Sequence, residues 1–295
     1  MPGLVRPSIL TSSLAAALAC SVAYPTTAPA QRDTSPFLES AVASGALIGG
    51  LGAILNRDSS ESWTAALWRG MSAGALGGWL QYQGKRQALK MASRNHLEYA
   101  WLARTLHAAG TSVIENAAAS RGPFDSFRFN LGFVRFDLDT RTRQVRSRLL
   151  PAALLGTIHV AQWGHFDAKR SLRTGVLTFR ARPTDHHVRG LAVTRVNTVL
   201  YGPWSEFMIS EVLAHELVHT LQYDDYAGAT MLFKPLVGFA EDWPMAKLGA
   251  RWVYPDVHAG IDMLRYEVLY GGQKTCANPL EREAYRFTSR TFGYC

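Results

Sequence analysis

The segment His215-Glu-Leu-Val-His219 is the one feature of this chain whose residue types and spacing name a chemistry. In a helix, positions i and i+4 lie on one face, so His215 and His219 can offer two imidazole nitrogens to one metal ion. Glu216 lies at the edge of that face, where it can reach a metal-bound water without binding the metal itself. The alternative is a helix whose two histidines make ordinary hydrogen bonds.

Two histidines do not complete a catalytic zinc site, which takes three protein ligands and leaves a fourth position for water. A third histidine six residues after the second is absent, because Asp225 stands there. A glutamate on a later helix is the other common third ligand. Glu281 and Glu283 both lie in the C-terminal segment that begins with Asn278 and Pro279. Asn278 is a good N-cap and Pro279 a good first residue of a helix.

The two glutamates have competing roles. Glu281 lies three residues after Asn278, so it could instead close a capping box at the start of the helix. Glu283 lies on an apolar face and needs a partner, which could equally be Arg286 or Arg290 at helical spacing. We expect Glu281 to be the third metal ligand and keep Glu283 as the alternative.

With these motifs the chain resembles the glutamate-ligand zincin metallopeptidases. Many of them pair H-E-x-x-H with a downstream helix that contains E-x-x-A followed by Asp, Glu or Asn. Here His215, Glu216 and His219 match the first motif, and Glu281 with Ala284 matches the second. The resemblance implies a zincin-like fold and a Zn²⁺ ion held by His215, His219 and Glu281.

The resemblance also implies a mechanism and a substrate class. Zinc lowers the pKa of its bound water, and Glu216 takes the proton as that water attacks the carbonyl of a peptide or protein substrate. The strand expected at residues 191–201 could accept an extended peptide by edge pairing, or could be an ordinary sheet strand. Tyr285 stands where these enzymes usually have a polar residue that orients a ligand. Candidate donors to the oxyanion, each of which could equally be structural, are Tyr223, Tyr226, His258, Tyr266 and Tyr285.

Helices and short strands are expected to position these residues. Helix is expected over residues 205–226, which hold no glycine or proline, and again in stretches of 240–270 and over 279–291. Phe127–Asp137 has the alternation of a half-exposed strand. The β-rich runs, broken by Asp, Gly and Pro turns, are 127–139, 144–150, 156–162, 175–182 and 191–201.

The chain before residue 123 is expected to be helical. Two small-residue segments, 41–55 and 65–80, repeat glycine or alanine every four residues, which lets two helices approach closely. We interpret them as a packed hairpin, with membrane association of residues 41–80 as the alternative. The first run is about fifteen residues, shorter than the roughly twenty that span a bilayer, and Arg69 interrupts the second. A helix is expected over 85–119, with Leu89, Leu97, Ala100, Trp101, Leu106 and Val113 on its buried side.

Together these patterns predict an α+β protein. With 295 residues, 47% of them hydrophobic and 18% charged, the chain can bury a full core and suits the globular class. We divide it into a signal peptide at 1–30, a helical region with the hairpin at 31–122, and a zincin-like domain at 123–295. This last part is expected to hold an antiparallel or mixed sheet and the metal-binding helix.

The N-terminus has the features of an export signal. Arg6 precedes an apolar run at Ile9–Ala23, and Ala28-Pro29-Ala30 forms an A-x-A cleavage site. A second interpretation is a lipoprotein, in which Cys20 carries a lipid. Both place the protein in the periplasm or envelope. There the two remaining cysteines, Cys276 and Cys295, are expected to form a disulfide, with two free thiols as the alternative.

The net charge of +8 is spread along the chain, with one modest arginine cluster over residues 141–148. Because no aromatic-interleaved basic stripe accompanies it, we do not expect a nucleic-acid partner. The favoured function is an exported zinc metallopeptidase. Two alternatives remain: a catalytically silent envelope protein of the same fold, with or without a structural zinc, and a membrane-associated scaffold built on the hairpin. Retention of Glu216 argues against the silent form, because a structural site needs no general base.

Overall fold

The computed structural model describes residues 34–182, 192–202, 208–234, 249, 251–270 and 277–288. For residues 267–269 it describes the backbone alone. The expected signal peptide, the lipidation site at Cys20 and the Cys276–Cys295 disulfide all lie outside the described residues, so they stay predictions.

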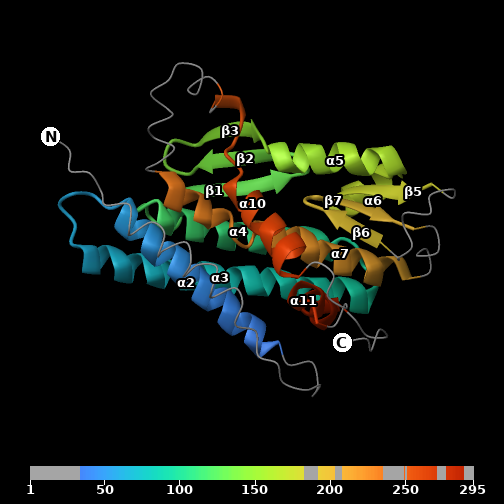
Figure 1. Ribbon diagram of the computed structural model, residues 1–295, viewed down its shortest axis with the longest axis horizontal. Coiled ribbons are helices and arrows are strands. Elements are labelled where there is room, and N and C mark those ends of the chain that lie inside the picture. Colours follow the sequence, from blue (N-terminus) through green and yellow to red (C-terminus); the bar gives the residue numbers. More distant parts are fainter. Residues whose placement is uncertain are drawn as a thin grey trace.

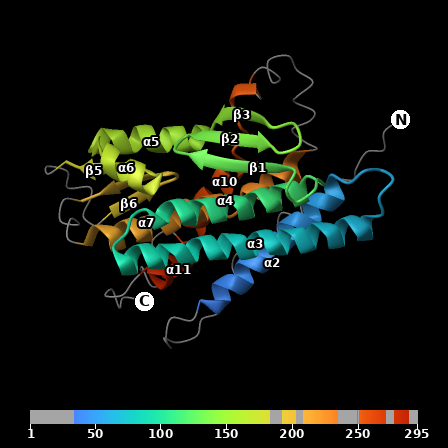
Figure 2. The same ribbon diagram turned by 180° about the vertical axis from the view of Figure 1, so that it is seen from behind.

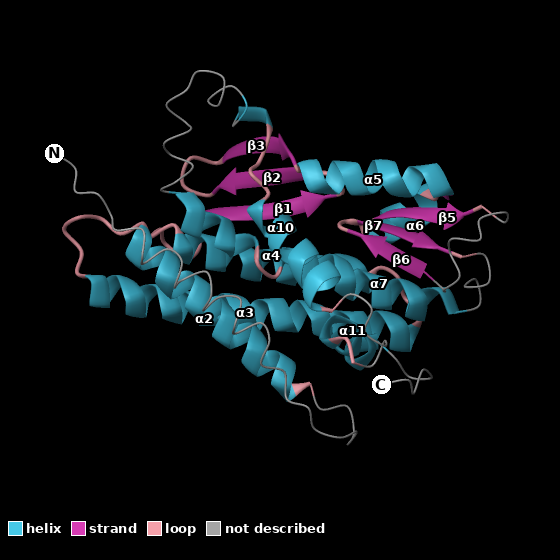
Figure 3. Cartoon of the chain, in the orientation of Figure 1, coloured by secondary structure: helices cyan, strands magenta, loops and turns pink. Residues whose placement is uncertain are grey.

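The described part of the chain is α+β, as the sequence predicts (Figure 3). Its α-helices are α2 (Ser35–Leu55), α3 (Trp63–Arg94), α4 (Tyr99–Ala118), α5 (Pro151–Trp163), α6 (Ala168–Thr174), α7 (Ile209–Asp224), α10 (Val257–Met263) and α11 (Pro279–Thr288), joined by a 3₁₀ turn η2 (Ala227–Phe233) and a π-helical segment η3 (Leu264–Leu269). Its strands are β1 (Ser126–Leu131), β2 (Val134–Asp139), β3 (Gln144–Leu149), β4 (Gly164–Phe166), β5 (Leu177–Ala181), β6 (Ala192–Arg195) and β7 (Thr198–Tyr201).

The strands form two small sheets above a helical base (Figure 1). The first is the antiparallel sheet β1-β2-β3. The second has the order β4-β5-β7-β6 and is mixed, because β5 and β7 run parallel while the other neighbours are antiparallel. Below them, α4 packs on β1 and α7 packs on β6 and β7. Helices α3 and α2 lie beneath α4, as the view from behind also shows (Figure 2).

Glycines set the spacing of the α2–α3 hairpin. A Cβ atom on Gly74 would lie 2.1 Å from the carbonyl oxygen of Gly45, and one on Gly49 would lie 2.4 Å from the carbonyl oxygen of Gly70. These distances are too short for any side chain, so only glycine allows the two backbones to approach this closely. The small-residue stripes that the sequence shows therefore face each other inside the hairpin.

One hydrophobic core joins the helical base to the motif helix. It contains residues from α2, α3, α4, β7, α7 and α11. The core therefore includes residues from both sides of residue 122, where the sequence analysis divides the chain. The division into domains stays a prediction. Among the most buried members of the core are Met91, Ala100, Tyr201, Ala214, Val218, Ala284 and Phe287. The helix that carries the two histidines is thus held on one side by the N-terminal helices and on the other by the second sheet.

A buried ion cluster ties α4 to the first sheet. Glu115, which is fully buried on α4, accepts hydrogen bonds from Arg135 of β2 at 2.7 and 3.1 Å and pairs with Arg128 of β1 at 3.0 Å. Asp137 pairs with Arg135 at 2.9 Å and with Arg148 at 2.7 Å. Because every charge has a partner of opposite sign, the desolvation cost of the cluster is offset by short-range attraction.

The structure corrects three expectations about secondary structure. Residues 156–162 are not a strand but the second half of α5, whose start at Pro151 suits the first turn of a helix. The run 127–139 is a hairpin of β1 and β2 that turns at Gly132, where φ is +57°. The helix expected over 85–119 is broken, because Asn95 adopts a left-handed conformation that ends α3 before α4 begins.

Burial on these helices follows the expected side only in part. Leu97, Ala100 and Val113 are buried, while Trp101 is exposed and packs its ring on Phe129. The expected strand 191–201 is likewise a hairpin, β6–β7, with its turn at residues 196 and 197.

Among the described residues, α2 is the one helix long and apolar enough to cross a membrane. Its most apolar stretch has a mean hydropathy of 1.6, and one third of that stretch is buried against the rest of the protein. The core helix of a soluble protein has the same length and composition.

Candidate metal centre

Helix α7 carries both histidines of the motif on its cleft-facing side. It begins at Ile209 and ends at Asp224, close to the limits expected from the sequence. The opposite side of the helix is buried through residues such as Leu213, Leu217 and Leu221. Because i and i+4 share a face, the rings of His215 and His219 lie next to each other, with their centroids 4.8 Å apart.

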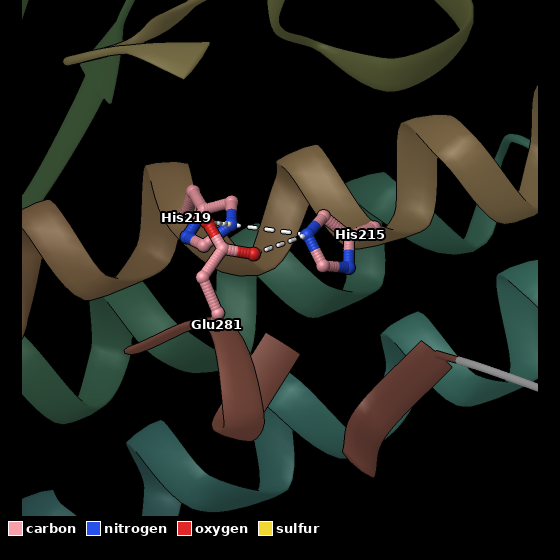
Figure 4. A group of neighbouring side chains, drawn as sticks. All are labelled: His215, His219 and Glu281. Atoms are coloured by element: carbon pink, nitrogen blue, oxygen red, sulfur yellow. Dashed lines mark hydrogen bonds and ion pairs between the residues drawn. The ribbon is translucent and has the colours of Figure 1, made fainter. Parts of the chain in front are cut away.

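Glu281 reaches the same point from α11 (Figure 4). Asn278 caps this helix by accepting a hydrogen bond from the backbone N–H of Leu280 at 2.9 Å, and Pro279 is its first residue, as the sequence predicts. The Glu281 side chain does not remain at the cap. Its Oε2 lies 3.2 Å from Nε2 of His215, and its Oε1 lies 3.5 Å from Nε2 of His219.

The three groups are spaced as ligands of one small ion. The two Nε2 atoms lie 3.1 Å apart, and each lies near a different oxygen of Glu281, at 3.2 and 3.5 Å; one ligand atom from each of the three residues lies within 4.8 Å of the others. Ligand atoms about 2.0–2.1 Å from a tetrahedral zinc ion lie about 3.3 Å from one another. Two imidazole nitrogens and one carboxylate are also a donor set that zinc accepts at catalytic sites. The residues present therefore fit a zinc ion.

The charges around the three-residue cluster favour a bound cation. Burial lowers the pKa of His219, but its hydrogen bond to Glu281 and the charges of Glu281 and Glu216 outweigh that effect and raise the pKa to about 9. Burial raises the pKa of Glu281, yet the two histidines hold it well below its ordinary range. The cluster thus stabilises positive charge between its carboxylates, as a divalent cation requires.

Glu283 is occupied elsewhere. Its Oε1 lies 2.8 Å from Nζ of Lys85 on α3, and both side chains are buried, with 6% and 5% of their surface exposed. Its Oε2 accepts a hydrogen bond from Gln222 at 2.8 Å. The partner of Glu283 is thus a lysine from a distant helix instead of the expected Arg286, and the other expected partner, Arg290, lies outside the described residues. Glu283 stands behind the three-residue cluster.

Gln222 connects this ion pair to the metal-binding face. Its amide nitrogen donates to Oε2 of Glu283 and to the carbonyl oxygen of Leu280, at 2.8 and 2.9 Å. Because both of these partners are acceptors, the amide oxygen must point the other way, where it lies 2.8 Å from Nδ1 of His219. Nδ1 therefore carries a proton, and when the ring is neutral the lone pair of Nε2 is directed at the cluster.

The N-terminal helices complete this support. Lys85 also donates to Oδ2 of Asp225 at 2.6 Å, and Nε2 of His107 on α4 lies 2.9 Å from Oδ1 of the same aspartate. Burial lowers the pKa of Lys85, but the charges of Asp225 and Glu283 raise it well above its ordinary value. The chain of contacts thus runs from His219 through Gln222, the Glu283–Lys85 pair and Asp225 to His107.

Glu216 lies beside the cluster without joining it. The residue is 6% exposed, and its Oε2 accepts a hydrogen bond from the hydroxyl of Thr194 on β6 at 2.6 Å. The same hydroxyl lies 3.2 Å from the backbone oxygen of Glu216. Thr194 therefore holds one oxygen of the carboxylate toward β6 and leaves the other able to take a proton.

The three-residue cluster, Glu216 and Thr194 open onto one cleft of about 1130 Å³. The cluster and Glu216 form part of its wall, and β6 forms another part from Ala192 to Arg195. Helix α5 contributes His159.

Of the expected oxyanion donors, Tyr223, Tyr266 and Tyr285 line the cleft. Tyr226 and His258 are buried in the described part of the protein, outside the lining of the cleft. The hydroxyl of Tyr223 donates to Asp256, and the ring of Tyr285 packs 4.5 Å from that of His215.

The structure thus brings His215, Glu216, His219 and Glu281 together and separates Glu283 from them. Sequence reasoning missed Thr194, Lys85 and His107, and it considered Asp225 only as the place of an absent histidine. One signal was present for Gln222, which lies three residues after His219 and so on the same face of the helix.

Comparison of the chain with models of protein families, with curated protein sequences and with solved structures finds no match.

Proposed function

We propose that this protein is a zinc-dependent hydrolase that cleaves peptide bonds. The observation that carries the proposal is the geometry of His215, His219 and Glu281, whose ligand atoms all lie within 4.8 Å of one another at the wall of a large cleft that Glu216 also lines. A structural zinc site has no need of a fourth, unligated carboxylate at a cleft, so this arrangement supports catalysis over a silent role.

The residues of the chain have distinct tasks in this chemistry. A zinc ion held by His215, His219 and Glu281 supplies a Lewis acid that acidifies water and polarises a carbonyl. Glu216 accepts the proton of the attacking water and later delivers it to the leaving amine. Thr194 orients the Glu216 carboxylate, while Gln222 holds His219 in the tautomer that presents Nε2.

Strand β6 offers a binding surface for an extended peptide. In the order β4-β5-β7-β6 it is an edge strand, paired with β7 on one side, and its residues Ala192–Arg195 line the cleft. A peptide that pairs with this edge gains backbone hydrogen bonds and is carried past Glu216. The cleft has room for side chains along this path.

The glutamate-ligand zincin class and an exported, envelope location complete the proposal. The class is supported by the order of the elements, in which β6–β7 precedes the motif helix and the third ligand follows on α11. Export is supported by the apolar N-terminal segment in the sequence and by α2.

The substitution Glu216→Gln tests the hydrolytic role. Because Glu216 is not a ligand, the variant should keep its zinc and its unfolding temperature but lose about 10²–10⁴-fold in hydrolysis of a denatured protein such as casein. Glu211→Gln, the same change at the cleft wall outside the cluster, serves as the matched control and should keep its rate. A Glu216→Gln variant as active as the wild type would refute the mechanism.

A further inference from the structure

The outward face of α3 changes character along its length. Its N-terminal half exposes Trp68, Leu76 and Trp79, which are 66%, 41% and 45% exposed. These positions recur at helical spacing on the side opposite the glycines that pack against α2. Three large apolar side chains in one row, facing away from the protein, are unusual for a surface without a partner.

The C-terminal half of the same face is basic. Arg86, Lys90 and Arg94 continue the row at intervals of four residues, and all three are exposed. No aspartate or glutamate occurs anywhere in α3. The remaining exposed cation of α3, Arg69, lies near the N-terminal end of the helix and pairs with Glu61 at 2.8 Å. We call the row from Trp68 to Arg94 the α3 outer face.

Helix α2, on the other side of α3, is also apolar, and most of its apolar side chains are half-buried. It has no charged side chain between Glu39 and Arg57, and only one third of its most apolar stretch is buried. Gly50 of α2 lies against Leu67 and Met71 of α3, which lie at the edge of the glycine-bearing side of α3 and not on its outer face. The α3 outer face itself presents the exposed tryptophans, next to a patch of cations.

We propose that the α3 outer face docks on the surface of an anionic lipid bilayer. Tryptophan is favoured at the membrane–water interface, where its ring is partly apolar and its N–H stays hydrated. The adjoining Arg86, Lys90 and Arg94 match the negative charge of phospholipid headgroups. A second copy of the chain offers no such match, because the same face holds no acidic residue.

The hairpin lies on the membrane and does not cross it. Crossing by α2 would separate Gly45 from Gly74 and Gly49 from Gly70, which form the closest backbone contacts of the hairpin. It would also remove Phe37 from the core that supports α7. Docking through the outer face keeps both sets of contacts and leaves the cleft, on the other side of α7, in water.

Quenching of tryptophan fluorescence by vesicles that contain brominated phosphatidylcholine and phosphatidylglycerol tests this proposal in the full chain. Residues 1–33 hold no tryptophan, so a leader that inserts by itself gives no signal. The wild type should be quenched. The double variant Trp68→Gln/Trp79→Gln should lose most of the quenching, while Trp252→Gln, which removes an equally exposed tryptophan elsewhere, should keep it.

The cations provide a second readout. Replacing Arg86, Lys90 and Arg94 by glutamine should lower the partition coefficient on these vesicles about fivefold for each charge removed, and wild-type binding should weaken in salt. Quenching that Trp68→Gln/Trp79→Gln leaves unchanged would overturn the proposal. Light scattering without vesicles gives a second test. If the wild type self-associates and the double variant does not, the proposal is also overturned, because the face would then bind a second copy of the chain.

Discussion

The amide oxygen of Gln222 accepts a hydrogen bond from Nδ1 of His219 at 2.8 Å, and the orientation of that amide is fixed by acceptors on its other side. A residue outside the proposed ligand set thereby decides which nitrogen of His219 faces the proposed metal position.

Replacing Gln222 by leucine should therefore weaken zinc binding. The change frees the His219 ring to rotate and to exchange tautomers, and such supporting contacts are typically worth about 10–100-fold in metal affinity. Competition with a chromogenic chelator measures the effect. Gln87→Leu, which alters a buried glutamine of α3 whose amide donates to the backbone oxygen of Gln83, is the matched control and should bind zinc as the wild type does. Equal affinities in the two variants would remove Gln222 from the account.

Glu281 and Glu283 should respond differently to the same change. Glu281→Gln removes a ligand charge, so zinc affinity should fall steeply while the metal-free protein stays folded. Glu283→Gln leaves the buried Lys85 with Asp225 alone, so the free energy of unfolding should fall, by up to about 3 kcal/mol, with a smaller loss of zinc affinity. Urea unfolding in the presence of a chelator, together with zinc content, separates the two effects. The reverse pattern would make Glu283 the ligand.

Acid should weaken the contact between α4 and the first sheet. Burial raises the pKa of Glu115, but Arg128 and Arg135 outweigh it and hold the pKa below the ordinary value of 4.5. A carboxylate whose pKa is lowered by folding stabilises the protein above its ordinary pKa, and this stabilisation is lost as the pH falls below about 4.5. Urea unfolding between pH 3 and 7 should show this loss. Glu115→Gln should be less stable at pH 7 and should depend less on pH below 5; an unchanged slope would exclude Glu115 as its source.

The α2–α3 contact should not tolerate a single added methyl group. Gly74→Ala would place a Cβ atom 2.1 Å from the carbonyl oxygen of Gly45, so the helices must separate, at a cost of about 1–3 kcal/mol. Gly260→Ala in α10 is the control, because nothing lies within 4 Å of its added Cβ, and it should be neutral or stabilising by up to about 1 kcal/mol. Thermal unfolding compares them, and equal stabilities would show that the hairpin is looser than described.

Local patterns in the sequence were sufficient to predict the α+β class, the motif helix, and that Glu281 and not Glu283 lies beside the two histidines. Residues of α7 and α11 that face the cleft are set by helical spacing and by the cap at Asn278, which are short-range features. Lys85 could not be found in this way, since its contact with Glu283 joins residues 198 positions apart. No pattern around Lys85 distinguishes a buried cation from one exposed on the surface of α3.

Two other differences between the expected and the observed structure, at α5 and at the α2–α3 hairpin, also have physical causes. The apolar stretch of α5 lacks a clear helical period because little of it is buried, so its β-branched residues suggested a strand. The glycine stripes of α2 and α3 are compatible with packing in water or in lipid. Only the structure shows that they face each other and that the exposed Trp68 and Trp79 lie on the opposite face of α3.

Metal analysis of the purified protein tests the central claim most directly. After incubation with zinc and dialysis at neutral pH, the wild type should retain about one zinc ion per chain, as expected for a single three-ligand site. His219→Ala should retain little or none, while His159→Ala, which changes a histidine that α5 contributes to the same cleft, should retain as much as the wild type. A wild type free of metal, or a His219→Ala variant that keeps its zinc, would contradict the account.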